Sequence, residues 1–176
     1  MVLALSSEQL AAISVHAERV YPEECCGLLV GKIHTQETEQ TKQLTRLVPL
    51  DNEWILEVLP TAALAQPSRG SIAEQSVTKS RRYWINPKDM LRVQKQARED
   101  GLDIIGIYHS HPDHVAVPSE CDRALAWPIY AYVIVSVCEG KAVDVQNWTL
   151  DSDHQFQPEP LKVSPSSAKD RMPVSA

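Results

Sequence analysis

The fold of this chain follows from Ile104-Ile105-Gly106-Ile107-Tyr108-His109-Ser110-His111-Pro112. An apolar run that ends in a polar segment is typical of a buried strand whose last residues emerge at the edge of a sheet. Side chains two residues apart in a strand project from the same face, so His109 and His111 point in the same direction. We therefore expect two imidazoles to be presented together at the end of a central strand.

A second polar group follows in Pro118-Ser119-Glu120-Cys121-Asp122. Ser119 and Asp122 have the spacing of a helix N-cap and its N3 position, and such a turn can aim both polar groups back at the two histidines. Taken alone, His-x-His is typical of surface or hydrogen-bonded histidines, and Ser-x-x-Asp is typical of a simple helix cap. The joint pattern, with Pro112 and Pro118 fixing the loop between, indicates a metal site.

His109, His111 and Asp122 supply three nitrogen and oxygen ligands, one fewer than a closed structural zinc site uses. The position left for water is the signature of catalytic zinc, which lowers the pKa of that water to about 7 and polarises carbonyl oxygens. The pattern therefore predicts one catalytic zinc ion and a hydrolytic reaction.

Such a reaction also needs a proton acceptor, and two glutamates precede the apolar run Cys25–Gly31. Glu24 shares strand parity with Cys26, whereas Glu23 faces the other way and is expected to be a solvated end residue. We therefore predict Glu24 as the general acid and base, and Ser119 as a hydroxyl donor to the oxyanion of a tetrahedral intermediate.

The composition is that of a single globular domain. The chain has 176 residues, 43% of them hydrophobic and 23% charged, and its net charge of -6 gives no general attraction to nucleic acid. The sequence contains neither an apolar run long enough to cross a membrane nor a secretion signal. Four cysteines without Cys-x-x-Cys pairs are expected to be free thiols, so we expect a cytoplasmic protein.

Helices and strands are predicted to alternate along the chain. Three helices are expected, each with a capping residue at its start: from 6 to 20, from 87 to 100, and from 119 to 127. Strands are expected at 23–31, 40–50, 104–112, 130–138 and 143–150, with an edge strand at 156–163.

This alternation predicts an α/β domain with a mixed sheet flanked by helices, and a site at the carboxyl end of the strand that carries His109. The domain is expected to span residues 1–163. Residues 61–82, which contain little bulky apolar content, are interpreted as a long flexible loop, either a lid or a disordered segment. Residues 164–176 are interpreted as a disordered tail.

These motifs resemble the JAMM metalloprotease (MPN-plus) family, particularly its small stand-alone bacterial members. The likeness is carried by His109-Ser110-His111-Pro112, by Pro118-Ser119-x-x-Asp122 and by Pro22-x-Glu24-x-Cys26-Gly27-Leu28-Leu29. It implies a cytidine-deaminase-like fold, with zinc on His109, His111 and Asp122, Glu24 as general acid/base and Ser119 as oxyanion donor. It further implies cleavage of peptide or isopeptide bonds after the C-terminal Gly-Gly of a ubiquitin-like or sulfur-carrier protein.

Two other functions are compatible with parts of the pattern. A non-catalytic MPN scaffold usually lacks one or more ligands, whereas this chain has all of them. A mononuclear iron oxygenase uses two histidines and one carboxylate, but its site commonly lies on a double-stranded β barrel, and this chain has too many helices for that.

Overall fold

A computed structural model describes residues 1–36, 39–54 and 78–166. In these residues the chain forms one eight-stranded mixed sheet with the strand order β7-β6-β5-β4-β2-β3-β1-β8. The strands are β1 (Val2–Ser6), β2 (Cys26–Gln36), β3 (Glu39–Leu50), β4 (Asp103–Pro112), β5 (Ala131–Cys138), β6 (Lys141–Leu150), β7 (Phe156–Pro158) and β8 (Leu161–Ser164). The helices are α1 (Ser7–Val20), α2 (Pro87–Glu99) and α3 (Glu120–Leu125). The predicted α/β class with a mixed sheet is confirmed.

Strand β4 lies in the middle of the sheet, between antiparallel β2 and parallel β5. Every residue of β4 after Asp103 is buried, which explains its nearly continuous apolar sequence. His109 is paired with Cys26 of β2 and with Ile134 of β5. The end of β4 is therefore held on both sides by backbone hydrogen bonds.

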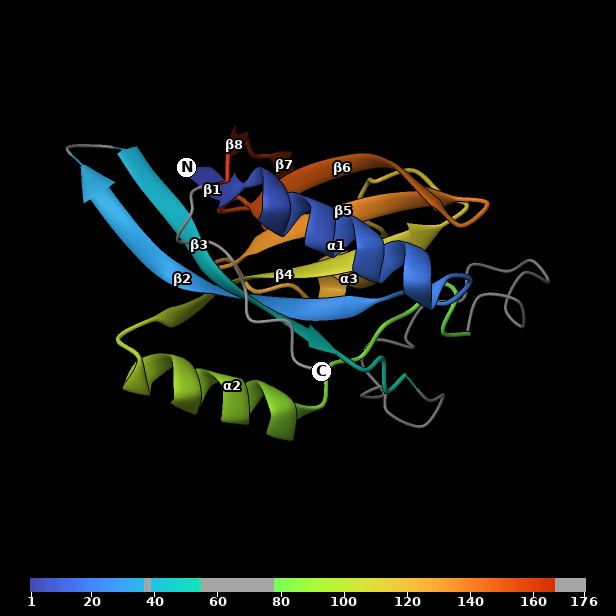
Figure 1. The fold of residues 1–176 in the computed structure, drawn as a ribbon, viewed down its shortest axis with the longest axis horizontal. Helices are drawn as coiled ribbons and strands as arrows, with labels where there is room; N and C mark the ends of the chain where they lie inside the picture. The colour runs from blue at the N-terminus through green and yellow to red at the C-terminus, as the bar shows by residue number, and fades with distance from the viewer. Residues whose placement is uncertain (37–38, 55–77, 167–176) are drawn as a thin grey trace.

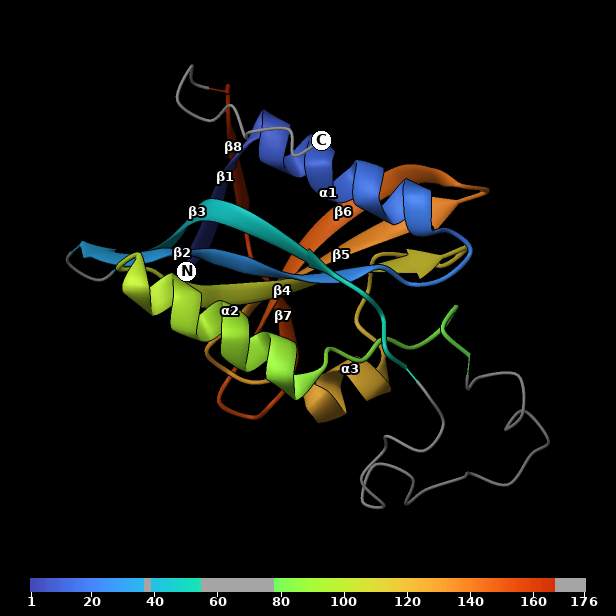
Figure 2. The same ribbon diagram turned by 60° about the horizontal axis from the view of Figure 1, so that its bottom comes forward.

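The two longer helices cover opposite faces of the sheet (Figures 1 and 2). Ile13 and Ala17 of α1 belong to one buried cluster, while Val93 and Ala97 of α2 belong to another. Adjacent residues of the strands alternate between these clusters, as in Leu28 and Leu29 of β2, which Figure 1 shows running between the two helices. Both faces of the central strands are thus covered.

The predicted helix starts are confirmed. Ser6 caps α1 in a capping box with Gln9, and Asn86 caps α2 with Pro87 at the first helical turn. After α2 the chain turns at Gly101, whose φ of +67° favours glycine. No helix of the described residues is long and apolar enough to span a membrane.

The prediction of one edge strand at 156–163 is wrong. The segment forms two short strands at opposite edges of the sheet: β7 pairs with β6, and β8 pairs with β1. Pro158 and Pro160 flank the break, and proline cannot donate to a ladder of backbone hydrogen bonds. Because the two edge strands are so close in sequence, the sheet curls towards itself, as Figure 2 shows.

Smaller differences concern element ends. Strand β1 was not predicted, α3 ends at Leu125 instead of 127, and β8 includes Ser164, which was expected in the tail. Leu91 of α2 is apolar but 68% exposed. Most of the expected loop at 61–82 lies outside the described residues, as does the tail beyond residue 166.

Candidate active site

The structure brings His109, His111 and Asp122 together at the carboxyl end of β4. The two imidazole Nε2 atoms are 3.1 Å apart. Asp122 Oδ1 lies 3.4 Å from His109 Nε2, and Asp122 Oδ2 lies 3.6 Å from His111 Nε2. Two imidazole nitrogens thus face the two oxygens of one carboxylate.

Helix α3 places Asp122 by its own capping geometry. The Ser119 Oγ accepts a hydrogen bond from the Asp122 backbone N–H at 3.2 Å, and Asp122 Oδ2 accepts one from the Ser119 N–H at 2.6 Å. The predicted N-cap and N3 roles of these residues are confirmed. The cap fixes the carboxylate so that its Oδ1 faces His109.

The three residues fit a tetrahedral metal ion. Bonds of about 2.0–2.1 Å from zinc to nitrogen or oxygen imply ligand separations of roughly 3.3 Å. The nitrogen–nitrogen distance of 3.1 Å and the nitrogen–oxygen distances of 3.4 and 3.6 Å lie around that value. One ligand atom from each residue lies within 4.8 Å of the other two. Without a cation, the lone pairs of two imidazole nitrogens and a carboxylate would face one another in a buried space.

Neighbouring groups orient the two imidazoles. His111 Nδ1 lies 2.9 Å from the carbonyl oxygen of Val115, which can only accept, so Nδ1 carries the proton and Nε2 presents its lone pair. The ring of His109 stacks on Tyr83, with centroids 4.5 Å apart and planes 25° from parallel. Both rings are thereby held with Nε2 towards Asp122.

Burial and charge act in opposite directions on these groups. Burial lowers the pKa of His109 to about 4, so its imidazole is neutral. Burial also lowers the pKa of His111, but the hydrogen bond with Asp122 and the charge of Glu24 outweigh it and raise the pKa overall. For Asp122 the raising effect of burial is outweighed by both histidines and by Ser119, so its pKa is lowered and it stays ionised.

Glu24 lies beside this group. The register that pairs Cys26 with His109 places Glu24 opposite His111 when it is continued, and cross-strand partners share a face. Glu24 is 4% exposed, and burial raises its pKa to about 8, with Asp122 adding to the shift and His111 opposing it. Glu23 is exposed, as expected. Glu24 can therefore gain and lose a proton near neutral pH.

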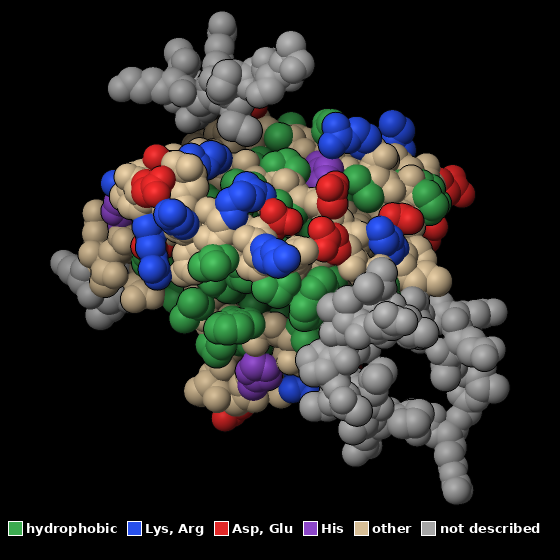
Figure 3. Space-filling model, turned by 90° about the horizontal axis from the view of Figure 1, so that it is seen from below, with side chains coloured by type: hydrophobic (Ala, Val, Ile, Leu, Met, Phe, Trp, Pro, Cys, Tyr) green, Lys and Arg blue, Asp and Glu red, His purple; other side chains and the backbone are tan. Residues whose placement is uncertain are grey.

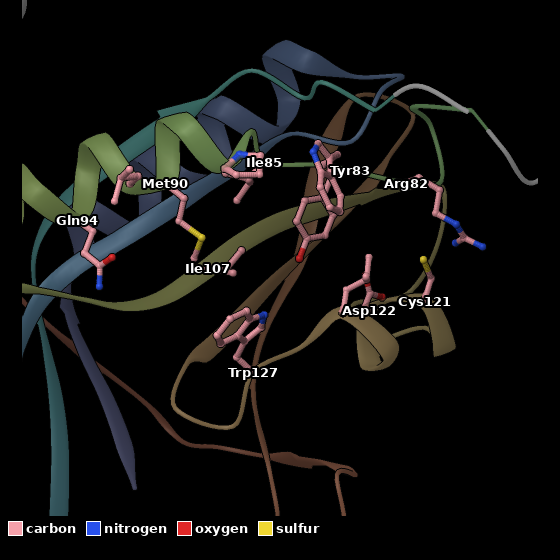
Figure 4. A pocket seen from close by; sticks show the side chains of 13 residues that line it. Arg82, Tyr83, Ile85, Met90, Gln94, Ile107, Cys121, Asp122 and Trp127 are labelled. Carbon is pink, nitrogen blue, oxygen red and sulfur yellow. The ribbon is translucent and has the colours of Figure 1, made fainter. Parts of the chain in front are cut away.

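Two pockets meet at the site. A pocket of about 240 Å³ is lined by Glu24, Arg81, Arg82, His111, His114, Val115, Val117 and Ser119. A larger one of about 400 Å³ is mainly apolar, and Figure 4 shows Tyr83, Met90, Ile107 and Trp127 directed into it. Figure 3 shows hydrophobic side chains gathered on the same side of the molecule as α2.

The sequence analysis did not predict three features of the site: the Tyr83 ring beside His109, the pair Arg81 and Arg82 in the pocket, and the hydrogen bonds of Asn52. The buried amide of Asn52 donates to the carbonyl of Glu24 at 3.0 Å and to that of Arg82 at 2.9 Å. Its Oδ1 accepts from the N–H groups of Trp54 and Trp84. An asparagine directly after a strand was the only signal, and it does not identify partners some thirty residues away.

Comparisons with known proteins agree with the geometry. A family model described as prokaryotic homologs of the JAB domain matches residues 6–151. A Haloferax volcanii protein named desampylase is 35% identical over 154 residues, which cover 85% of this chain and 89% of that protein. A Mycobacterium tuberculosis protein named CysO-cysteine peptidase is 28% identical over 164 residues, or 92% of this chain and 91% of that protein. The solution structure of a Desulfitobacterium hafniense protein has the same fold, with a TM-score of 0.68 at 24% identity and coverage of 96% and 97%.

Proposed function

Because the chain belongs to the family of prokaryotic homologues of the JAB domain, we propose that it is a zinc-dependent peptidase or isopeptidase. It cleaves the bond that follows the C-terminal Gly-Gly of a ubiquitin-like or sulfur-carrier protein. The relatives named desampylase and CysO-cysteine peptidase support an activity of this kind.

The observation that supports the proposal most is the meeting of two buried imidazoles, one ionised carboxylate and a separate buried glutamate. His109, His111 and Asp122 would hold the zinc ion, which supplies hydroxide near neutral pH and polarises the scissile carbonyl. Glu24 remains outside this ligand set, in the pocket that His111 also lines.

Glu24 and Ser119 are proposed to handle the proton and the developing charge. The Glu24 carboxylate takes a proton from the attacking water and passes it to the leaving amine, as its pKa near neutrality allows. Ser119 Oγ accepts one hydrogen bond from the Asp122 N–H, so the hydroxyl proton is free to point into the pocket. There it donates to the oxyanion of the tetrahedral intermediate.

The alternatives have less support. A scaffold has no use for a buried glutamate beside a complete ligand set, and the iron oxygenase lacks any named counterpart among the relatives reported above. We also propose that residues 1–163 form the catalytic domain and that the protein acts in the cytoplasm, consistent with four free cysteines.

The test is to incubate zinc-loaded protein with sulfur-carrier fusions extended beyond Gly-Gly and to follow cleavage by mass spectrometry. We expect a single cut after the second glycine. The Glu24→Gln variant should retain zinc and lose activity by roughly 10²-fold or more, the usual contribution of a general base. Full activity in Glu24→Gln would remove this residue from the mechanism.

A further inference from the structure

The smaller pocket is lined by two positively charged residues that have no role in zinc binding or in proton transfer. It is lined by Glu24, His111 and Ser119, and also by Arg81 and Arg82. Neither arginine forms an ion pair with any described residue. Within the described part of the chain, the Arg82 side chain donates one hydrogen bond, from Nη1 to the carbonyl of Arg81, at 3.0 Å. Two guanidinium groups thus border the site without a carboxylate partner in residues 1–36, 39–54 and 78–166.

The backbone holds these arginines close to Glu24. The Glu24 N–H donates to the carbonyl of Lys79 at 2.7 Å, and Arg81 N–H donates to the carbonyl of Thr78 at 3.0 Å. Asn52 bridges the carbonyls of Glu24 and Arg82. The positive charges of both arginines act on Glu24, where they oppose the effect of burial on its pKa.

The larger pocket differs in character. Its lining is mostly aromatic and aliphatic, and Arg82 is the one cationic residue that the described ranges contribute to it. Figure 4 shows the Arg82 side chain directed away from Tyr83 and Trp127, on the side of Cys121. The two pockets therefore offer an apolar surface on one side of Asp122 and a cationic one beside Glu24.

We propose that Arg81 and Arg82 bind the α-carboxylate of a single amino acid that leaves from the Gly-Gly end of the carrier protein. This inference rests on the proposed function. Glu24 protonates the leaving nitrogen, and in a C-terminal residue the carboxylate carbon lies two bonds from that nitrogen, about 2.5 Å away. An isopeptide-linked lysine has only methylene groups there. The guanidinium fork matches a carboxylate in shape and charge.

The reaction balances without any other reactant. The oxygen of water bonds to the carbonyl carbon of the second glycine, and the bond from that carbon to the leaving nitrogen breaks. Both water protons end on the nitrogen, the first through Glu24, so the amino acid leaves with a protonated amine. The products are a carrier that ends in a glycine carboxylate and a free amino acid, whose own carboxylate stays unchanged throughout.

The experiment compares two fusions that differ in one group: carrier-Gly-Gly-alanine with a free carboxylate, and the same fusion as alaninamide. For the wild-type protein we expect kcat/KM to be about 10- to 100-fold higher for the acid, the range expected for charge-assisted hydrogen bonds to a carboxylate. The Arg81→Gln/Arg82→Gln double variant should bring the ratio of the two rates towards one. Arg98→Gln, an exposed arginine on α2, serves as the matched control and should keep the wild-type ratio.

Equal cleavage of the acid and the amide by the wild-type protein would overturn the inference and leave the proposed function intact. Faster cleavage of a lysine isopeptide than of the acid would overturn it as well. If neither fusion nor the lysine isopeptide is cut, the proposed function fails, and a binding measurement then tests the role of Arg81 and Arg82. In that case calorimetry with the Glu24→Gln protein should still show tighter binding of the acid form of a Gly-Gly-alanine peptide, and equal affinities would reject carboxylate recognition.

Discussion

Among single residues, Ser119 combines two roles that can be separated. Its Oγ accepts from the Asp122 N–H and so caps α3, and the same hydroxyl lines the pocket that contains Glu24. Ser6 makes the same capping box at the start of α1, with its Oγ 3.1 Å from the Gln9 nitrogen. Ser6 belongs to neither pocket lining. The chain thus contains a matched control for the loss of a serine cap.

We expect Ser119→Ala to lower kcat by about 10²-fold, as deletion of one oxyanion donor usually does. Ser6→Ala should lower the free energy of unfolding by about 1 kcal/mol, the typical contribution of a serine cap, and leave kcat unchanged. Steady-state kinetics and urea unfolding of both variants provide the comparison. If both variants lose stability alike and neither loses activity, Ser119 is a helix cap and nothing more.

The buried carboxyl of Glu24 should make the metal-free protein sensitive to pH. Its pKa rises from an ordinary 4.5 to about 8 on folding, so the folded state holds a proton that the unfolded state has released. The resulting stability is present below pH 4.5 and is lost as pH rises towards 8. The amide that replaces the carboxyl in Glu24→Gln cannot ionise, so the free energy of unfolding of this variant should not fall with pH for this reason.

Urea unfolding in the presence of a chelator measures this effect. Between pH 5 and pH 8, Glu24→Gln should gain roughly 2–4 kcal/mol in free energy of unfolding relative to the wild type. Glu23→Gln alters the neighbouring exposed side chain and should show no such gain. A difference between Glu24→Gln and wild type that does not vary with pH would mean that Glu24 is not buried as described.

At the level of elements, the site depends on how the end of β3 is joined to the segment before α2. Asn52 follows β3, and its amide group makes hydrogen bonds to Glu24, Arg82, Trp54 and Trp84. The Glu53 N–H adds a backbone hydrogen bond to the Trp84 carbonyl at 3.1 Å. Through these bonds Asn52 positions both Glu24 and the segment that carries Tyr83.

Asn52→Ala should lower the free energy of unfolding by roughly 2–4 kcal/mol, because buried carbonyl and N–H groups lose their partner. It should also lower kcat far more than it changes KM, because the Glu24 carboxyl is no longer held in the position from which it transfers a proton. Asn86→Ala removes the N-cap of α2 and is the control: it should cost about 1 kcal/mol in stability without that kinetic effect. Parallel losses of kcat in both variants would indicate general destabilisation.

The sequence was sufficient to predict the helices and strands that have strong local signals. Capping residues gave the starts of all three helices, and the apolar run before His109 gave β4. The position of Glu24 was inferred from strand parity alone. The contacts of Asn52 and the stacking of Tyr83 on His109 could not be inferred in this way, because they join residues that local patterns do not relate.

For the whole molecule, the decisive feature is the curl of the sheet, which brings β7 and β8 to opposite edges within one short segment. Glu159, between these strands, is 6% exposed, and its Oε2 accepts from Asn147 Nδ2 at 2.7 Å. Lys42 of β3 is 1% exposed; burial lowers its pKa, and the charge of Glu159 opposes that shift. Which edge each strand joins depends on this tertiary pairing, so the hydrophobic pattern of 156–163 could not reveal it.

Glu159→Gln should lower the free energy of unfolding, because the charge of Glu159 opposes the effect of burial on the Lys42 cation. Lys42→Met in the same protein removes that cation and should restore most of the loss. Urea unfolding at about pH 7 of both single variants and the double variant measures the coupling. Strictly additive losses would show that the two charges do not interact.

The zinc content of Asp122→Ala tests the central claim most directly, since it asks whether two imidazoles from β4 and one carboxylate from α3 bind the same ion. Elemental analysis after gel filtration should find one zinc per chain in the wild type and in Asp144→Ala, which alters an exposed acid of β6. Asp122→Ala should retain little zinc. Undiminished zinc in Asp122→Ala would contradict the ligand set and, with it, the proposed hydrolase.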